Sequence, residues 1–329
     1  MLNIIKGKNV DKTPIWFMRQ AGRYLPEYHT IFNKGKNFLD VCYNPELATE
    51  ITLQPIKRFN LDAAIVFADI LLVPDALGCN VEFIKNVGPI IKGMIDIENL
   101  DFNKSINHLN PIFQTIKNVK QELSSEKTII GFAGAPWTVL AYIIEGQSSK
   151  TFEKSISFIY QNKKLFRELI NIITEFTIIY LNKQIEAGAD VVQLFDSWSG
   201  LLNEELFLEF VIEPTRIIKN RVKAPVIGFP KGCGVKYLQY AQITKVDGLS
   251  VDYTMPLEWI RDNLQPILPV QGNLDPLMLA YDLDSAKKYV SKIFNILDKK
   301  SFIFNLGHGI NRNTPVDHVQ EIINEIRKY

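Results

Sequence analysis

The chain has 329 residues, of which 47% are hydrophobic and 22% charged, and its formal net charge is +1. This composition is typical of a globular protein, and it lacks the strong basic excess expected of a protein that binds nucleic acid or a membrane surface. Three cysteines without a CxxC spacing predict reduced thiols in a cytoplasmic protein rather than a disulfide framework or a zinc ribbon. An anionic ligand must therefore be met by a local cluster of cations.

Eight short apolar runs recur along the chain, each bounded by glycine, proline or polar residues, and they predict β-strands. Most runs are continuously apolar rather than alternating, which is typical of parallel strands covered on both faces. The run at 63–78 is interrupted by Asp69, Pro74 and Asp75, so we do not expect it to span a membrane. The predicted strands are 13–19, 63–69, 128–134, 190–197, 225–232, 248–254, 267–274 and 301–309.

Helical segments lie between these strands. Residues 44–59 begin with Asn44 as an N-cap, and Pro55 is expected to kink or interrupt this helix. Residues 166–188 show helical periodicity up to a terminal glycine, and residues 315–329 close the chain. Eight strands that alternate with helices predict a (β/α)8 barrel that forms one domain over 1–329. A doubly wound sheet is the alternative, but no GxGxxG follows the first strand.

Polar residues gather where the predicted strands end. In (β/α)8 barrels the active site is built at the C-terminal ends of the strands, so residues far apart in sequence meet at one mouth. We therefore expect a site there. The residues at the predicted ends are Arg19, Asp69, Asp196, Ser197, Lys231, Asp252, Tyr253, Asn273, Asp275, Asn305 and His308.

The segment TPIWFMRQAGRYLPEY (13–28) places Arg19 and Arg23 four residues apart, directly after an apolar run. A guanidinium is a planar fork of donors suited to two-point contact with a carboxylate or phosphate. Gly22 between them permits a tight turn or the close approach of a ligand. The pair is thus a candidate anion clamp, and two structural arginines that bridge neighbouring loops are the alternative.

Other candidates are single residues with a structural alternative. Asp69 is either a helix N-cap or a carboxylate that stabilises a developing cation. His308, between glycines in NLGHGI, is the best placed of four histidines, although a turn residue is the alternative. Ser197 lacks a GxSxG motif, so we interpret it as a hydrogen-bond donor, and Tyr142 lies in a helix where a core tyrosine is the alternative. No zinc-ligand spacing or cofactor motif is found.

Four motifs together resemble the uroporphyrinogen decarboxylase family, from about residue 10 to the C-terminus: PIWFMRQAGRYLPEY, GFAGAPWTVLAYIIEG, VQGNLDP and NLGHGI. The resemblance implies a single (β/α)8 barrel that forms a homodimer with its mouths facing each other. It implies removal of the four acetate carboxylates of uroporphyrinogen III, which gives coproporphyrinogen III and four CO2. No metal or organic cofactor is expected, because a protonated pyrrole supplies the electron sink that such cofactors usually provide.

The resemblance also implies residue roles. Asp69 would accept hydrogen bonds from pyrrole N–H groups and stabilise a cationic intermediate, while Arg19 and Arg23 would bind acetate and propionate carboxylates. Arg19 is also implied as a proton donor, although arginine is a poor acid near neutral pH because it holds its proton tightly. The other implied substrate contacts are Gln20, Ala21, Gly22, Phe132, Tyr142, Ser197 and His308.

Two other function classes remain as alternatives. A corrinoid-linked methyltransferase of the same superfamily would need a zinc–thiolate site, but GFPKGCG has no histidine two residues before Cys233, and no cysteine lies near His308. A non-catalytic tetrapyrrole-binding protein would bind porphyrins without turnover. The intact set of Asp69, Arg19, Arg23 and Tyr142 favours the enzyme.

Overall fold

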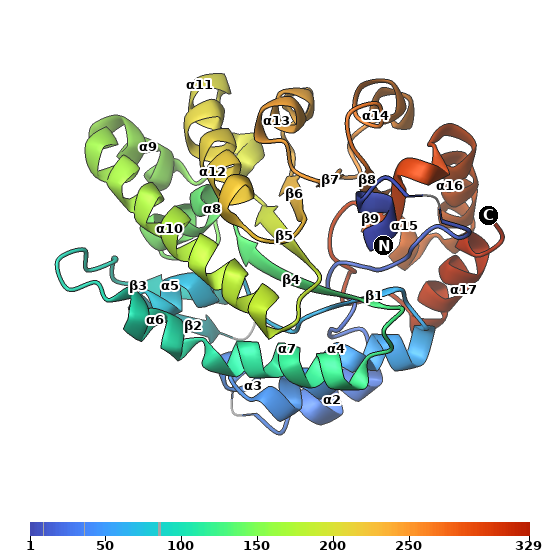
Figure 1. The fold of residues 1–329 in the computed structure, drawn as a ribbon, viewed down its shortest axis with the longest axis horizontal. Coiled ribbons are helices and arrows are strands. Elements are labelled where there is room, and N and C mark those ends of the chain that lie inside the picture. The colour runs from blue at the N-terminus through green and yellow to red at the C-terminus, as the bar shows by residue number, and fades with distance from the viewer. Residues whose placement is uncertain (9, 36, 85–86) are drawn as a thin grey trace.

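A curled parallel sheet forms the centre of the molecule (Figure 1). The computed structural model describes residues 1–8, 10–35, 37–84 and 87–329. Seven strands pair in the order β1-β4-β5-β6-β7-β8-β9, and an antiparallel hairpin of β2 and β3 lies outside this sheet. The strands of the sheet are β1 (Ala63–Ile65), β4 (Thr128–Gly134), β5 (Val191–Asp196), β6 (Val226–Pro230), β7 (Gly248–Ser250), β8 (Val270–Leu274) and β9 (Phe302–Leu306), and those of the hairpin are β2 (Asn80–Ile84) and β3 (Gly88–Lys92).

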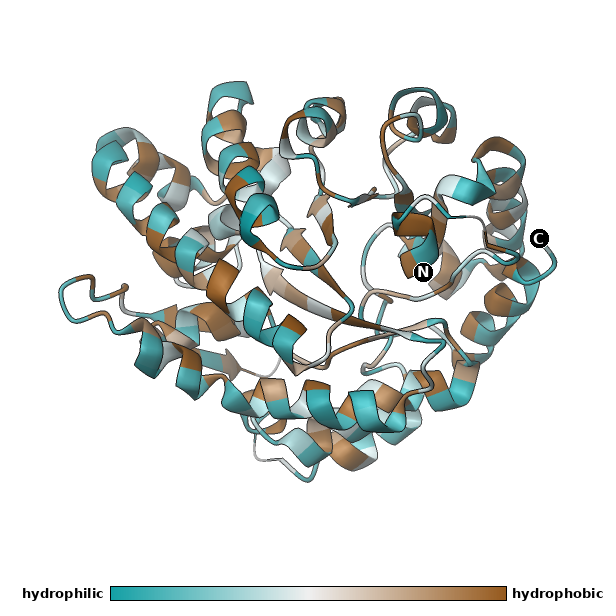
Figure 2. Ribbon diagram, in the orientation of Figure 1, coloured by the Kyte–Doolittle hydropathy of each residue, from teal (hydrophilic) through white to brown (hydrophobic). Residues whose placement is uncertain are grey.

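Helices surround the sheet, so that each parallel strand is followed by a crossover on the outside (Figure 1). Figure 2 shows hydrophobic residues along the strands and hydrophilic residues on the outer helices. The helices are α1 (Leu2–Ile5), α2 (Pro26–Phe32), α3 (Phe38–Cys42), α4 (Pro45–Phe59), α5 (Leu72–Ala76), α6 (Phe102–His108), α7 (Asn110–Glu122), α8 (Pro136–Glu145), α9 (Glu153–Gln161), α10 (Lys163–Ala187), α11 (Glu204–Phe207), α12 (Glu213–Arg221), α13 (Lys236–Thr244), α14 (Leu257–Asn263), α15 (Pro276–Tyr281), α16 (Leu283–Ile296) and α17 (Val316–Ile326).

The segment 13–19 lies between the two edges of the sheet but is not a regular strand. Ile15 forms an isolated parallel bridge with Phe304 of β9, and its carbonyl accepts a hydrogen bond of 3.0 Å from the backbone N–H of Asp62, just before β1. Pro14 has no N–H to donate to a ladder, and Arg19 turns into the left-handed region at φ 60°. The prediction of a strand over 13–19 is therefore wrong, and the regular sheet has seven strands.

The other seven predicted strands are present, but most are shorter at their C-terminal ends. β1 ends at Ile65 and β9 at Leu306, so Asp69 and His308 lie in the loops beyond the sheet. Asp69 accepts hydrogen bonds within a tight turn instead of continuing a ladder. The hairpin of β2 and β3 was not predicted.

The predicted helices are confirmed, with one correction. Asn44 caps α4, since its side-chain oxygen accepts a hydrogen bond of 3.0 Å from the N–H of Leu47. α4 continues through Pro55, so the predicted interruption is wrong. Proline removes only one hydrogen bond, and the buried face of α4, which includes Pro55, packs on the core.

A polar layer crosses the interior of the sheet beneath the loops. The indole N–H of Trp16 donates to Gln271 Oε1 at 2.7 Å, and the Gln271 amide donates to Gln193 Oε1 at 3.0 Å and to Ser250 Oγ at 2.5 Å. These bonds tie the 13–19 segment to three strands. In the described part of the chain, no helix has both the length and the apolar character needed to cross a membrane.

Candidate active site

A row of rings crosses the C-terminal ends of three strands and reaches the loop after β9. The ring centroids of Phe132 and Phe195 are 5.5 Å apart, those of Phe195 and Phe229 are 6.2 Å apart, and those of Phe229 and His308 are 6.4 Å apart. Phe132 lies on β4 and His308 follows β9, so these rings bring two predicted site residues to one mouth. The row provides a largely apolar floor.

Asp69 is held in a turn after β1. Its Oδ1 accepts a hydrogen bond of 2.9 Å from the N–H of Leu71, and its carbonyl accepts one of 3.3 Å from Leu72. The Asp69 residue is half-buried. Loss of solvent around the carboxyl raises its pKa, while the Leu71 N–H and the Arg19 guanidinium act in the opposite direction. Asp69 is not the N-cap of α5, whose capping residue is Leu71. It is a poorly solvated carboxylate with an arginine close by.

The backbone around Arg19 is held by the loop after β9. The N–H of Met18 donates to Asn305 Oδ1 at 3.1 Å, and the carbonyl of Met18 accepts from the N–H of Ile310 at 2.9 Å. The Arg19 side chain then lies against Gly309, because a Cβ atom at residue 309 would stand 2.5 Å from Arg19 Cδ. Because Gly309 has no side chain, it leaves the space that the Arg19 side chain occupies.

His308 is neutral at physiological pH. Its burial lowers the pKa of the imidazole to about 3, helped by the positive charges of Arg19 and Lys231 and opposed by Asp252. Both cations are thus close enough to act on the ring. A neutral imidazole presents one N–H donor and one acceptor nitrogen, so it hydrogen-bonds to a ligand without adding charge.

Tyr142 and Ser197 meet at one corner of the mouth. The ring of Tyr142 on α8 lies 6.3 Å from the ring of Trp198, which directly follows Ser197. The indole N–H of Trp137 donates to the carbonyl of Trp198 at 3.0 Å and holds this loop on α8. Both Tyr142 and Ser197 are half-buried, so their hydroxyl groups are available as hydrogen-bond donors.

A buried carboxyl underlies this corner. Asp196 is only 1% exposed, and its Oδ1 accepts a hydrogen bond of 2.5 Å from Thr138 Oγ1, which in turn accepts one of 3.2 Å from the N–H of Trp198. Asp196 Oδ2 has no hydrogen-bond partner among the described residues. Burial raises the pKa of Asp196 to about 7. Thr138 thus links the two residues on either side of Ser197 to α8.

Gln20 braces the loop that carries the two arginines. It is fully buried, its Oε1 accepts a hydrogen bond of 3.0 Å from the N–H of Phe17, and its amide donates to the carbonyl of Ala63 at 2.9 Å. The side chain is therefore occupied within the protein. Its backbone N–H also donates to the carbonyl of Phe17 at 2.9 Å, and its carbonyl accepts from the hydroxyl of Tyr24 at 2.9 Å, so Gln20 holds the shape of the loop.

Arg23 follows Arg19 by four residues in the same loop. The side chains of both arginines are exposed, and Ala21 and Gly22 between them are partly exposed. The Arg23 charge acts on Tyr28, whereas the charge of Arg19 acts on Asp69 and His308. Asp69, Arg19 and His308 are thus brought together, and Arg23 lies further along the same loop.

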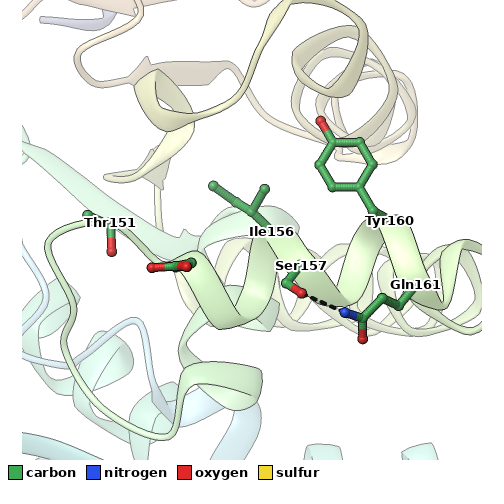
Figure 3. A pocket seen from close by; sticks show the side chains of 6 residues that line it. Thr151, Ile156, Ser157, Tyr160 and Gln161 are labelled. Atoms are coloured by element: carbon green, nitrogen blue, oxygen red, sulfur yellow. Dashed lines mark hydrogen bonds between the residues drawn. The ribbon is translucent and has the colours of Figure 1, made fainter.

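Two surface grooves lie elsewhere. One lies on α9 (Figure 3), where Ser157 Oγ accepts a hydrogen bond of 2.9 Å from the Gln161 amide. The other lies between residues 97–102 and the start of α10, where Arg167 already pairs with Glu209. No predicted site residue lines either groove. We place the candidate site at the mouth because titratable groups converge there.

Within residues 1–8, 10–35, 37–84 and 87–329, no three His, Cys, Asp or Glu side chains are grouped so that they could hold a metal ion. Cys42, Cys79 and Cys233 are each buried and unpaired. Burial raises the pKa of the Cys233 thiol well above its usual value. A thiol that keeps its proton is a weak nucleophile and a weak ligand.

Comparison with known proteins identifies the family. A family model described as uroporphyrinogen decarboxylase (URO-D) matches residues 1–329. The chain is 49% identical over 316 residues to the uroporphyrinogen decarboxylase of Neorickettsia sennetsu, with 96% of this chain and 97% of the relative covered. It is 48% identical to that of Rickettsia conorii, with 100% and 96% covered.

The chain belongs to the uroporphyrinogen decarboxylase family. Among solved structures, a methyltransferase from Methanosarcina mazei superimposes with a TM-score of 0.82 over 99% of this chain and 97% of its own, at 20% sequence identity. That identity shows a shared fold alone.

Sequence reasoning missed the residues that position this family site. Gln184 on α10 accepts from the N–H of Phe132 and donates to its carbonyl, both at 2.9 Å. Thr138 stands within the apolar stretch PWTVLAYIIE, and a buried polar residue in such a helix was a usable signal. The contact between Gly309 and Arg19 had no such signal, because it joins distant segments.

We predict that Gly309→Ala displaces Arg19 and raises KM for the family substrate by about 10-fold, the effect of losing one charge-assisted hydrogen bond. The new Cβ would stand 2.5 Å from Arg19 Cδ, and the side chain must move to relieve this contact. Gly248→Ala is the control, since its nearest neighbour would be at an ordinary 3.4 Å. An unchanged KM in the Gly309 variant would show that Arg19 is not held there.

We predict that Asp196→Asn gains stability relative to the wild type as pH rises from about 4 to about 7. The folded pKa is about 7 against a reference of 3.8, so over this window the folded carboxyl keeps its proton while that of the unfolded chain ionises, and the wild type loses stability as pH rises. The measurement is the difference in Tm between variant and wild type at several pH values. Asp282→Asn is the control, because hydrogen bonds from Ser285 lower the pKa of Asp282 below its reference of 3.8, so its Tm difference should stay flat from about pH 4 to about pH 7. A pH-independent difference for Asp196→Asn would contradict the prediction.

Proposed function

We propose that this chain decarboxylates the four acetate side chains of uroporphyrinogen III to methyl groups and releases coproporphyrinogen III and four CO2. The observation that carries the proposal is the 49% identity to a uroporphyrinogen decarboxylase over 96% of the chain. The grouping of Asp69, Arg19 and His308 at one mouth supports it. The comparisons do not favour the corrinoid-linked methyltransferase alternative.

Each decarboxylation needs a place for the electron pair of the broken C–C bond. Protonation of a pyrrole carbon next to the acetate-bearing carbon makes the ring cationic. The bond to CO2 then breaks, and its electrons form an exocyclic double bond and neutralise the ring. A second proton converts the methylene to a methyl, and loss of the first restores the aromatic pyrrole. The net change per acetate is uptake of one proton and release of one CO2, so no other electron sink is required.

Asp69 is the proposed partner of the cationic ring. Its carboxylate is poorly solvated, as the raised pKa indicates, so it gains more from a nearby positive charge than an exposed carboxylate would. One of its oxygens is already engaged by the Leu71 N–H, which fixes the direction of the other. Pyrrole N–H groups would donate to that free oxygen.

The cations of the mouth are the proposed carboxylate binders. The charge of Arg19 acts on both Asp69 and His308, and Arg23 extends the positive charge along the same loop. Neither arginine forms an ion pair among the described residues. Tyr142 and Ser197 would add neutral hydrogen bonds at the opposite corner, above the Phe132 floor. We assign the backbone of Gln20, Ala21 and Gly22 to the same substrate loop.

We also infer that the chain closes as a (β/α)8 barrel of one domain and works as a cytoplasmic homodimer. The Ile15 bridge to Phe304 and the bond from Asp62 to Ile15 support an eighth barrel position for residues 13–19. One contiguous hydrophobic core from Ile4 to Ile326 supports a single domain. The family resemblance supports the dimer and the compartment, and the net charge of +1 supports the absence of a nucleic-acid partner.

The direct test is anaerobic incubation of purified protein with chemically reduced uroporphyrinogen III. Products are then oxidised and separated by carboxylate number. We expect a progression from eight carboxylates through seven, six and five to four, without added metal or cofactor. Unchanged octacarboxylate from folded protein would overturn the proposal.

We predict that Asp69→Asn lowers kcat/KM by about 10²–10³-fold, the usual effect of removing one preorganised charged partner. The amide oxygen still accepts the Leu71 hydrogen bond, so the turn and the Tm should be retained. The measurement is steady-state turnover of uroporphyrinogen III beside a thermal melt. Near-normal turnover in a folded variant would rule out the proposed role of Asp69.

A further inference from the structure

The backbone of the turn after β6 is held firmly against the Ser197 loop. The N–H of Lys231 donates to the carbonyl of Asp196 at 3.1 Å. The carbonyl of Lys231 accepts from the N–H of Gly200 at 3.2 Å and from Ser199 Oγ at 3.2 Å. Each of the two polar backbone groups of Lys231 is therefore satisfied within the protein, and the turn is fixed beside a predicted site residue.

Asp252 fixes the same turn from the other side without forming an ion pair with Lys231 among the described residues. Its Oδ2 accepts from the N–H of Gly232 at 2.7 Å and from the hydroxyl of Tyr237 at 2.9 Å. Its Oδ1 accepts from the N–H and the hydroxyl of Thr254 at 2.9 and 2.5 Å. A carboxylate offers about four acceptor positions, so Asp252 is fully used by these neighbours.

The Lys231 ammonium lacks the partners that the nearby lysines Lys219 and Lys236 have among the described residues. Lys236 on the next helix donates to the carbonyl of Leu202 at 2.6 Å, and Lys219 on the preceding helix pairs with Asp247 at 2.8 Å. Among the described residues, the Lys231 ammonium has neither a carboxylate within ion-pair distance nor a hydrogen-bond partner. Lys231 is half-buried, so its ammonium is less solvated than that of an exposed lysine.

The turn that carries Lys231 lies beside the mouth. Phe229, two residues earlier on β6, packs its ring against His308, with 6.4 Å between centroids. Lys231 and Arg19 both act electrostatically on the His308 ring, and Asp252 acts on it in the opposite sense. Two cations beside one neutral imidazole repel each other, and an anionic ligand between them would relieve that repulsion.

We propose that Lys231 is a substrate-binding residue whose ammonium pairs with a carboxylate of the tetrapyrrole beside Arg19 and His308. The proposal rests on the proposed function and adds a third cation to the arginine pair. The rigid turn places the base of the side chain, and the flexible stem lets a compact charge follow a carboxylate as the macrocycle shifts between acetates. A solvated surface lysine without contact to substrate is the alternative that the test must separate.

The test compares Lys231→Met, Lys231→Arg and the wild type in anaerobic turnover of uroporphyrinogen III. Loss of a hydrogen bond between charged groups predicts a KM about 10-fold higher for Lys231→Met, with kcat changed less than about twofold. Lys231→Arg should recover part of this loss because it keeps the charge. At about 1 M salt, where the screening length is about 3 Å, the two KM values should converge. A purely structural role would not produce that convergence.

Lys223→Met is the matched control. Lys223 stands three residues before β6, its side chain is 69% exposed, and it lies 3.8 Å from Glu186. The Lys223→Met substitution removes the same charge at the opposite end of the same strand, so its KM should equal that of the wild type. Thermal melts establish that each variant is folded.

The outcomes are distinct. A KM for folded Lys231→Met within about twofold of the wild type at low salt would overturn the proposal, as would a KM increase that is independent of salt and not reduced by arginine. Lack of turnover by the wild type would instead reject the proposed function. In that case, an anaerobic fluorescence titration with uroporphyrinogen III still compares the affinities of wild type and Lys231→Met. Equal affinities would overturn the inference.

Discussion

The electrostatic coupling between Asp69 and Arg19 is the interaction on which the candidate site depends. A half-buried carboxylate is unfavourable without a nearby positive charge, and the guanidinium supplies one without forming an ion pair that would consume it. The same guanidinium acts on His308 and helps to keep that ring neutral. Burial has the larger effect on both pKa values, and Arg19 of the 13–19 segment adds one positive charge that acts on both groups, in the loops after β1 and β9.

The supporting structure places backbones rather than active groups. Asn305 holds Met18, Thr138 holds Trp198, and Asp252 holds Gly232, each by a side chain that bonds to a backbone N–H. Loops that follow strands have no ladder to satisfy their backbone, so side chains must do so. One carboxylate oxygen of Asp69 accepts such a bond from Leu71, and its other oxygen then remains available to a ligand. These hydrogen bonds hold the loops in place before a ligand binds, so the site is preorganised.

Sequence patterns predicted much of the fold because apolar runs report burial on both faces of a sheet, as in β4 and β6. They failed for 13–19, where residues 15–18 are buried but only Ile15 forms an isolated bridge, since hydrophobicity alone does not specify a ladder. The hairpin of β2 and β3 was not predicted because its strands are only partly buried and show no regular alternation. For the site, strand-end position located Asp69, Arg19 and His308 together, whereas the partners of Thr138, Gln184 and Gly309 depend on tertiary contacts that no local spacing encodes.

A fixed set of cations meets a ligand whose charge declines during the reaction. Uroporphyrinogen carries eight carboxylates and coproporphyrinogen four, so each step removes one negative charge while the positive charge of the mouth is unchanged. The chain is near neutral overall, and therefore long-range attraction contributes little compared with contacts at the mouth. Affinity should then fall stepwise as acetates are lost, and the final product is the form that the mouth holds least. In the proposed site, the electrostatics that attract the substrate would thereby favour release of the product.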